Sequence, residues 1–574
     1  MAVNNGGETL FDAHRWRRRL SVAQGREPAD LVIAGGRVVD VFAEELVEAD
    51  VAIVDGVIAG VGRYESARAR IEAAGKVVAP SFIDAHVHLE SSLLWLPEYA
   101  RAVLPHGTGA VVTDPHEMAN VCGLPSVEAM RSAARNLPLR IAFTAPSCVP
   151  ASEHESPGAE FGVNEIAAML RWPETVGLGE LMNFPGVLAG SDDIAAKLAI
   201  SPGRRRDGHA PGLRGTALQA YAGSGVGSDH ESTAIDEARE KLRAGLMLML
   251  REGSTEKNLR ELLPLVTDAT YPRCCFASDD RDCHDLIRKG HVDDILRTAI
   301  DAGLSPLRAI RMATWNAADY WRLPAIGAVA PGYEANLVLL DDLTRVAVSA
   351  TLYRGVVVAQ DGACIAALDP APPPADIRST VNLAPLRRSA LRLPLDRATH
   401  AVEVIPGQIV TRFTPVTPRV AGDEVLADPA RDLLKLVCVE RHHATGRVGV
   451  GYVLGFGLRR GAVASSIAHD AHNIVAIGAD DTDLMAAIAT VADSQGGLAV
   501  VADGKLLAHL ALPIAGLLSD RPANEVAAAY SRLEATAREL GSPLASPFGQ
   551  LAFLALSVIP AARVTDRGLL HITM

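Results

Sequence analysis

The chain has 574 residues and a formal net charge of −13 at pH 7, from 55 Lys and Arg against 68 Asp and Glu. A chain this acidic is a poor partner for a nucleic-acid backbone, and aromatic residues at 4% offer few stacking surfaces for single strands. Hydrophobic residues at 49% and charged residues at 21% exclude a disordered chain and fit a globular one of about three or four domains.

The first residues and the apolar segments bear on where the protein works. Arginines cluster between Arg15 and Arg19 without a hydrophobic stretch after them, so we expect no secretory signal. Apolar stretches such as Leu551–Ala562 are shorter than the ~20 residues needed to cross a bilayer, so we expect no membrane association. The 7 cysteines form no Cys-x-x-Cys pair, which favours a reducing compartment. We therefore expect a cytoplasmic protein.

Two separated segments have the residue pattern of short β-strands. In residues 31–80, Val and Ile runs are interrupted by Gly35-Gly36 and Asp55-Gly56, which are typical of hairpins. Similar runs return in residues 325–367. The two segments are predicted to pair into one small β-sandwich domain, with residues 1–30 as an N-terminal extension.

Residues 81–324 alternate strand-like apolar runs with helical stretches. The candidate strands end at Asp84–His88, Val111–Asp114, Ala142–Ala145, Leu178–Leu181, Gly208–Ala210, Ser228–Glu231, Leu248–Glu252 and Ala277–Asp280. About eight βα units within about 250 residues are typical of a (β/α)8 TIM barrel, which carries its chemistry at the C-terminal ends of the strands. The predicted fold class is therefore α/β, with this barrel at its centre.

A proline-rich connection at 368–376 separates a further region from the barrel. Beyond it, strands are expected at Ile474–Ile477 and Leu498–Val501, and a helix at Ala523–Leu540. Residues 376–574 are therefore predicted to form a C-terminal α/β domain.

The sharpest local motif is Asp84-Ala-His86-Val-His88, at the end of an apolar strand. Side chains at i and i+2 of a strand share a face, so His86 and His88 are placed to bind one cation. Two packed surface histidines would give the same pattern. Other candidate ligands also follow strands; they are Glu180, His209, His230 and Asp279. A single His, Glu or Asp at a strand end more often has a structural role than a metal-binding one. A barrel, however, brings all of its strand ends together at one opening, so these residues are expected to lie close to one another.

A second pair, Asp114 and His116, follows the second strand around Pro115. Orienting residues, a further metal site or an ordinary turn all fit it; we favour an orienting or substrate-contacting role. Cys275 has the strand parity of Asp279 but lies four residues deeper, so it is predicted to belong to the barrel core.

These segments resemble the amidohydrolase superfamily and, more narrowly, bacterial adenine deaminases. The resemblance rests on five segments, namely 84–92, 113–117, 208–213, 228–231 and 468–473, and covers roughly residues 30–574. It implies hydrolytic, metal-dependent deamination of adenine to hypoxanthine and ammonia in purine salvage or catabolism.

The resemblance also implies roles for individual residues. The metal ligands are expected to be His86, His88, Glu180, His209, His230 and Asp279, around a centre of two Mn²⁺ ions, with Fe²⁺ or Zn²⁺ as alternatives. Many relatives bridge two metals with a carboxylated lysine; no lysine occurs between Lys76 and Lys197, and Glu180 stands in the bridging place. The catalytic residues are expected to be Asp279, Glu180 and His230, with Asp279 taking a proton from water and passing it on. Substrate contacts are expected from Asp114, His116, Glu90 and Glu231, in a homo-oligomer, a dimer.

Other functions remain open at this point. The nearest is an amidohydrolase acting on a cyclic amide such as a hydantoin or dihydropyrimidine, which a lysine bridge would have favoured. A non-catalytic barrel is another, although such proteins usually lose ligands. A cytidine-deaminase zinc site is excluded because the chain has no Pro-Cys-x-x-Cys. We also expect the C-terminal domain to help close the active site through the segment of His469 and His472, although these groups would equally serve to stabilise their own domain.

Overall fold

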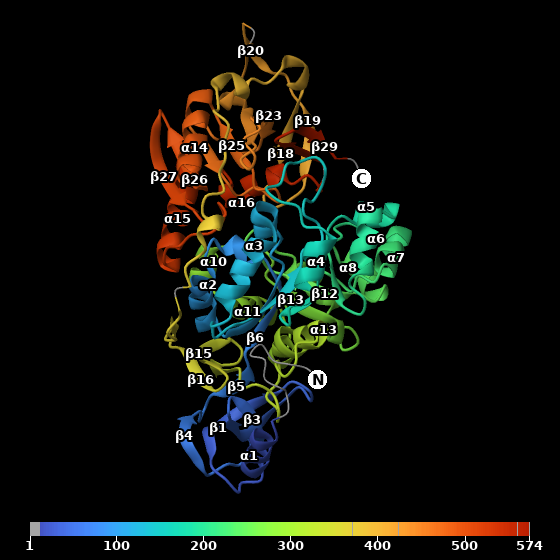
Figure 1. Ribbon diagram of the computed structural model, residues 1–574, viewed down its shortest axis with the longest axis vertical. Helices are drawn as coiled ribbons and strands as arrows, with labels where there is room; N and C mark the ends of the chain where they lie inside the picture. Colours follow the sequence, from blue (N-terminus) through green and yellow to red (C-terminus); the bar gives the residue numbers. More distant parts are fainter. Residues whose placement is uncertain (1–11, 370, 423, 560, 573–574) are drawn as a thin grey trace.

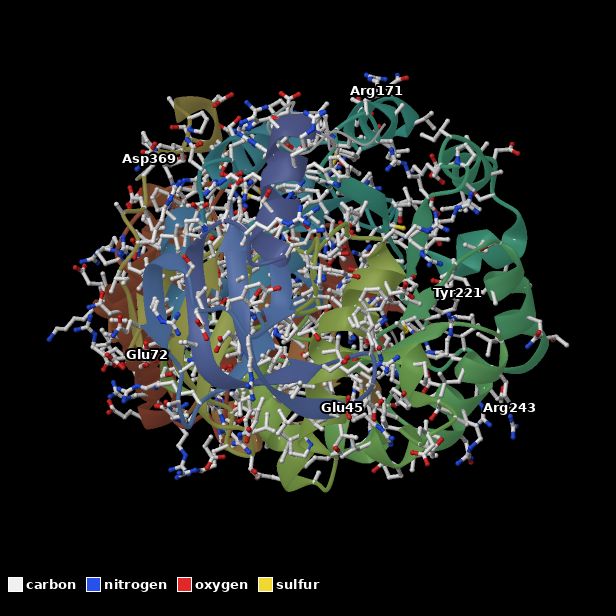
Figure 2. All side chains as sticks on the ribbon, turned by 90° about the horizontal axis from the view of Figure 1, so that it is seen from below. Glu45, Glu72, Arg171, Tyr221, Arg243 and Asp369 are labelled. Carbon is white, nitrogen blue, oxygen red and sulfur yellow. The ribbon has the colours of Figure 1, made fainter. Side chains whose placement is uncertain are left out.

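The computed structural model describes residues 12–369, 371–422, 424–559 and 561–572, so the first part of the expected N-terminal extension lies outside the described residues. Figure 1 shows a sheet built mainly from the start of the chain at one end and the red and orange C-terminal strands at the other. The middle of the chain lies between them. Figure 2 views the molecule from the first end, with Glu45 and Glu72 of that sheet toward the viewer.

One hydrogen-bonded sheet joins the two segments that were predicted to pair, residues 31–80 and 325–367; we call it the N-terminal sheet. Its strands are β1 (Ala29–Asp40), β2 (Glu45–Val54), β3 (Val57–Gly62), β4 (Ala67–Glu72), β5 (Val77–Pro80), β14 (Leu337–Asp342), β15 (Ala347–Tyr353), β16 (Val356–Gln360) and β17 (Ala363–Cys364). β5 and β14 pair antiparallel, which links the two segments. Asp55 and Gly56 both have positive φ, as the tight β2–β3 hairpin requires. Helix α1 (Ala13–Ala23) precedes the sheet and is capped by Asp12.

The parallel strands of residues 81–324 carry the candidate ligands. They are β6 (Phe82–Val87), β7 (Thr108–Thr113), β8 (Arg140–Ala145), β9 (Thr175–Leu181), β10 (Arg205–Gly208), β11 (Ser228–Asp229), β12 (Met247–Arg251) and β13 (Cys274–Ala277). β6 to β10 form one parallel sheet and β11 to β13 another, and a bridge between Val87 and Asp279 connects the end of β6 to the residues after β13. The predicted strand ends coincide with the ends of these strands.

Helices follow the parallel strands along the chain. They are α2 (Leu96–Val103), α3 (His116–Ala134), α4 (Val163–Met169), α5 (Phe184–Ala189), α6 (Asp192–Ala199), α7 (Gly215–Gly223), α8 (Ile235–Arg243), α9 (Leu259–Leu262), α10 (Cys283–Arg288), α11 (Val292–Asp301), α12 (Pro306–Arg311) and α13 (Ala317–Trp321). Beneath the strand ends, a buried apolar cluster includes Ile83, Val112, Met249 and Cys275, so Cys275 is a core residue as predicted. The 7 cysteines, all within the described residues, are free.

The C-terminal region, residues 376–574, is built on a second large sheet. Its strands are β18 (His400–Val404), β19 (Thr411–Pro415), β22 (Leu434–Val439), β23 (Val448–Leu454), β24 (Ala462–Ser465), β25 (Ile474–Gly478), β26 (Gly497–Ala502) and β27 (Lys505–Ala511). Small hairpins pair β20 (Arg419–Ala421) with β21 (Glu424–Leu426) and β28 (Ala562–Thr565) with β29 (Gly568–His571). Its helices are α14 (Asp481–Asp493), α15 (Ala523–Glu539) and α16 (Pro547–Ala552). The strands predicted at 474–477 and 498–501 and the helix predicted at 523–540 are confirmed as β25, β26 and α15.

The C-terminal region shares its core with the parallel-strand part of the chain. One buried apolar cluster contains Leu93 and Trp95 together with Leu512 and Leu518. The backbone joins the same parts, since the Ser519 N–H donates to the Leu93 carbonyl over 2.8 Å. Among the described residues, no helix combines the length and the apolarity needed to span a membrane.

Candidate metal centre

The first group of converging side chains comes from β6 and the residue that follows β13. Nε2 of His86 and Nε2 of His88 lie 3.2 Å apart, and Asp279 Oδ1 lies 3.2 and 3.3 Å from them. Backbone hydrogen bonds fix this arrangement, because the His88 N–H donates to the Asp279 carbonyl and the Asp279 N–H donates to the His86 carbonyl. The i, i+2 spacing on β6 thus places both imidazoles on the face where Asp279 arrives.

Glu180, near the end of β9, connects this group to a second one. Its Oε1 lies 3.2 Å from Nε2 of His88. Its Oε2 lies 2.8 Å from Nδ1 of His209 and 3.3 Å from Nε2 of His230. The two oxygens of one carboxylate therefore face two separate sets of donor atoms.

Hydrogen bonds to the far side of the rings orient the first two imidazoles. Nδ1 of His86 lies 2.7 Å from Asp207 Oδ2, and Nδ1 of His88 lies 3.0 Å from the Asp114 carbonyl oxygen. Both partners are acceptors, so each Nδ1 donates and each Nε2 faces the site, where it can bind a proton or a cation. Such outer partners are typical of metal-binding histidines.

The donor atoms fit a divalent metal. Lone pairs of ring nitrogens facing carboxylate oxygens at about 3 Å repel unless a proton or cation lies among them. Neither ring nitrogen of His230 has a hydrogen-bond partner, although the residue is buried. Burial opposes protonation of His86, yet Asp207 and Asp279 raise its pKa well above the ordinary value, so the site attracts positive charge. Imidazole and carboxylate donors without thiolate fit Mn, Fe or Zn.

A pocket opens over these ligands and is walled by both large parts of the chain. From the parallel-strand part it is lined by His88, His116, Glu117, Glu180, Met182, His209, Glu231, Arg251, Asp279 and Asp280. From the C-terminal region it is lined by Ile409, His469, Asp470, Phe553, Leu556, Val558 and Ile559. The C-terminal region thus supplies the apolar and part of the polar wall of the pocket, as expected for a domain that covers the site.

Comparison with known proteins places the chain in a family. Residues 77–362 match the model of the amidohydrolase family, and residues 408–574 match that of the adenine deaminase C-terminal domain. An adenine deaminase of Dehalococcoides mccartyi is 44% identical over 560 residues, covering 96% of this chain and 97% of the relative. One of Nitratidesulfovibrio vulgaris is 44% identical over 559 residues, covering 96% of each chain. One of Methanothrix thermoacetophila is 43% identical over 556 residues, covering 96% of this chain and 97% of the relative.

The chain belongs to the adenine deaminase family. Three of the segments that carried the resemblance meet at the candidate metal centre, because His86, His88, His209 and His230 all belong to them. The segment 468–473 reaches the same pocket from the C-terminal region through His469 and Asp470.

The four residues predicted to contact substrate separate into two pairs. His116 and Glu231 line the pocket. Glu90 and Asp114 are not among its lining residues. Asp114 Oδ2 instead accepts the Glu180 backbone N–H over 2.8 Å, and Glu90 Oε1 accepts the Met118 N–H over 3.2 Å. In this deaminase family member one oxygen of each carboxylate is thus used by a backbone N–H group next to the pocket.

Arg251 is a site residue that the sequence reasoning missed. It ends β12, and its guanidinium contacts Asp279 Oδ2 at 2.6 Å and the Glu231 carboxylate. Burial opposes ionisation of Asp279, but Arg251 and the two β6 histidines lower its pKa well below the ordinary value. The available signal in the sequence was an arginine directly after the apolar run Met247–Leu250. Asp207, two residues before His209, is a second site residue that was not predicted; its Oδ2 lies 2.7 Å from Nδ1 of His86.

Proposed function

We propose that this protein hydrolyses adenine to hypoxanthine and ammonia at a site whose residues would hold two metal ions, with Glu180 shared between the two donor sets. The observation that carries the reaction is the 44% identity, over 96% of the chain, to proteins named adenine deaminase. The bridging role is supported by the two Glu180 oxygens, which face different donor sets. The cyclic-amide alternative is not favoured by these relatives.

The residues that would hold the metals divide into two groups. His86, His88 and Asp279 would hold one ion and His209 and His230 the other, with Glu180 shared between them. We propose manganese first, then iron or zinc, since the donors are nitrogen and oxygen. A divalent cation in such a site lowers the pKa of a water molecule toward about 7 and so supplies a nucleophile at neutral pH.

Asp279 is the proposed proton carrier. Its Oδ1 faces the β6 histidines, whereas its Oδ2 lies 2.6 Å from Arg251 at the pocket wall. Arg251 keeps the carboxylate ionised and fixed in direction. In the proposed role, the ionised Asp279 would accept a proton from the attacking water and return it to the departing nitrogen. Glu180 and His230 are the other proposed catalytic residues, acting through the metals that they hold.

Substrate contacts are proposed for His116 and Glu231, which line the pocket. Glu231 is also fixed by Arg251, so the same guanidinium aligns a proton carrier and a substrate contact. Glu90 and Asp114 are now proposed as supports of α3 and β9, because both hydrogen-bond to backbone N–H groups there.

The finer architecture is likewise a proposal. We propose that residues 81–324 form a (β/α)8 barrel from β6 to β13, that 31–80 and 325–367 form a small β-sandwich domain, and that 376–574 form the adenine-deaminase-type α/β domain. We further propose a cytoplasmic dimer that serves purine salvage or catabolism and binds neither nucleic acid nor membrane.

Ammonia release tests the reaction directly. Manganese-loaded protein is expected to release ammonia from adenine, and to release far less from adenosine, guanine and hydantoin. Production of hypoxanthine, followed by its absorbance, identifies the product. Robust turnover of hydantoin with none of adenine would overturn the proposal in favour of a cyclic-amide hydrolase.

Metal removal tests the two-ion centre. Dialysis against a chelator is expected to abolish adenine turnover, and activity is expected to return in proportion to added Mn²⁺ until about two equivalents are bound. Bound metal is counted by atomic emission alongside the activity. Full activity at one equivalent would show that Glu180 does not bridge.

A further inference from the structure

A cluster of histidines joins the C-terminal region to the wall of the pocket. Glu117, in the first turn of α3, lies opposite the loop between β24 and β25. Its Oε1 lies 2.6 Å from Nδ1 of His469 and 3.2 Å from Nε2 of His116, and its Oε2 contacts Nε2 of His472. All four residues are buried, so one carboxylate is held by three rings from two parts of the chain.

The hydrogen bond to Nδ1 of His472 supports a clamp, in a cluster whose Glu117, His469 and His472 also lie close enough together to hold a metal ion. Nδ1 of His472 accepts the Ala468 backbone N–H over 3.2 Å, so its ring proton must be on Nε2, facing Glu117. Burial lowers the pKa of His472 to about 3, so the ring is neutral and carries that single proton. Nε2 of His472 contacts Glu117 Oε2, so this ring adds a second contact between the C-terminal region and the carboxylate.

His469 is itself held rigidly in the C-terminal region. Its ring stacks on Phe553 with centroids 4.6 Å apart and planes at 16°. Its backbone N–H donates to the Ala552 carbonyl over 2.9 Å, at the end of α16. The donor that reaches Glu117 is therefore fixed by the packing of the C-terminal region.

His116, the third of these rings, connects Glu117 to the pocket. Because Nε2 of His116 is turned toward Glu117, Nδ1 is the atom that the ring presents to the metal centre. It lies 3.3 Å from Glu180 Oε1, is buried and has no hydrogen-bond partner. A buried polar atom without a partner, aimed into a pocket, is a place for a ligand atom.

We propose that His469, assisted by His472, is a positioning residue for the reaction: it fixes Glu117, and Glu117 fixes His116 with Nδ1 toward the substrate. This inference rests on the proposed function, since it assigns His116 to adenine. It makes the C-terminal region part of the active site through a chain of named hydrogen bonds, in addition to its apolar cover. Outer partners of this kind typically contribute about 10- to 100-fold to activity or metal affinity.

Two substitutions at one position separate positioning from packing. His469→Ala removes the donor to Glu117, whereas His469→Asn places an amide N–H near the position of Nδ1 and keeps it. His443→Ala is the matched control: His443 is an exposed histidine of the C-terminal region whose Nε2 donates to the Pro157 carbonyl over 2.9 Å. It removes a contact between the same two parts of the chain outside the pocket.

Two readouts follow each variant. His469→Ala is expected to lower kcat/KM for adenine by about 10- to 100-fold, while His469→Asn stays within about fivefold of wild type and His443→Ala is unchanged. Carbethoxylation of His116 by diethyl pyrocarbonate, measured by peptide mass spectrometry, is expected to become several-fold faster in His469→Ala alone. Bound metal is expected to stay equal in all variants.

The outcomes are distinct. Equal loss in the alanine and asparagine variants would reduce His469 to a packing residue, and unchanged His116 reactivity in His469→Ala would break the proposed chain. Loss of a metal ion in His469→Ala would replace the clamp by a metal site. Absence of adenine turnover by wild-type protein would refute the proposed function, whereas the His116 reactivity still decides the positioning role.

Discussion

Glu180→Gln is expected to lower kcat for adenine at least about 100-fold and to reduce the bound metal below two ions. Glutamine keeps the size of the side chain, but its amide nitrogen cannot bind a cation, so one of the two donor sets loses its shared oxygen. The pair of contacts to His88 at 3.2 Å and His209 at 2.8 Å is the geometry that the substitution breaks. Steady-state kinetics and metal analysis of the same sample measure both effects.

The fold is expected to survive this substitution. The Glu180 backbone N–H keeps its hydrogen bond to Asp114, and the side chain contributes little to the apolar core. Glu174→Gln, just before the other end of β9 and paired with Arg131 away from the pocket, is the matched control and is expected to behave as wild type. A Glu180→Gln protein with two metals and normal turnover would remove the bridging role.

Asp279→Asn is expected to lower kcat by about 100-fold or more while leaving KM for adenine nearly unchanged. An amide preserves the size and one oxygen donor but does not accept a proton, so binding is retained and proton transfer is lost. The φ of residue 279 is +55°, a region that asparagine tolerates well, so no backbone strain is introduced. Separate measurement of kcat and KM distinguishes the two roles.

The stability of this variant is predictable from Arg251. Removing one partner of a buried ion pair costs about 3–5 kcal/mol when the remaining charge is left alone. Arg251 keeps its contact with Glu231, so the loss in unfolding free energy is expected to be smaller and the protein to remain folded. Asp268→Asn, on an exposed side chain ahead of β13, serves as control. An effect on KM alone would show that Asp279 positions substrate and transfers no proton.

The sequence by itself determined the local placement of the metal ligands. Strand geometry puts His86 and His88 on one face whatever surrounds them, and the largely apolar run Val176–Leu178 before Glu180 marked where β9 stops. The Asp55-Gly56 turn was predictable for the same reason, because few residues adopt its positive φ values. Such features depend on neighbours within a few positions.

The direction of a side chain beyond a strand end was decided by the tertiary structure. Glu90 lies two residues after His88 and Glu231 lies directly after His230, and only Glu231 lines the pocket. After β6 the chain enters a 3-10 turn at Leu89–Ser92, which points Glu90 toward the backbone of α3. The sequence does not show this turn, so it does not tell which of the two glutamates reaches the pocket.

The contacts that complete the site were also decided by tertiary structure alone. Glu117 and His469 are 352 positions apart, and His86 and Asp207 are 121 apart, yet each pair is hydrogen-bonded. Each of these residues is ordinary in its own segment, and its role depends on the acceptor that packing brings to it. Long-range packing is set by the burial of apolar surface shared between the parallel-strand part and the C-terminal region, which leaves no periodic signal linking the polar partners.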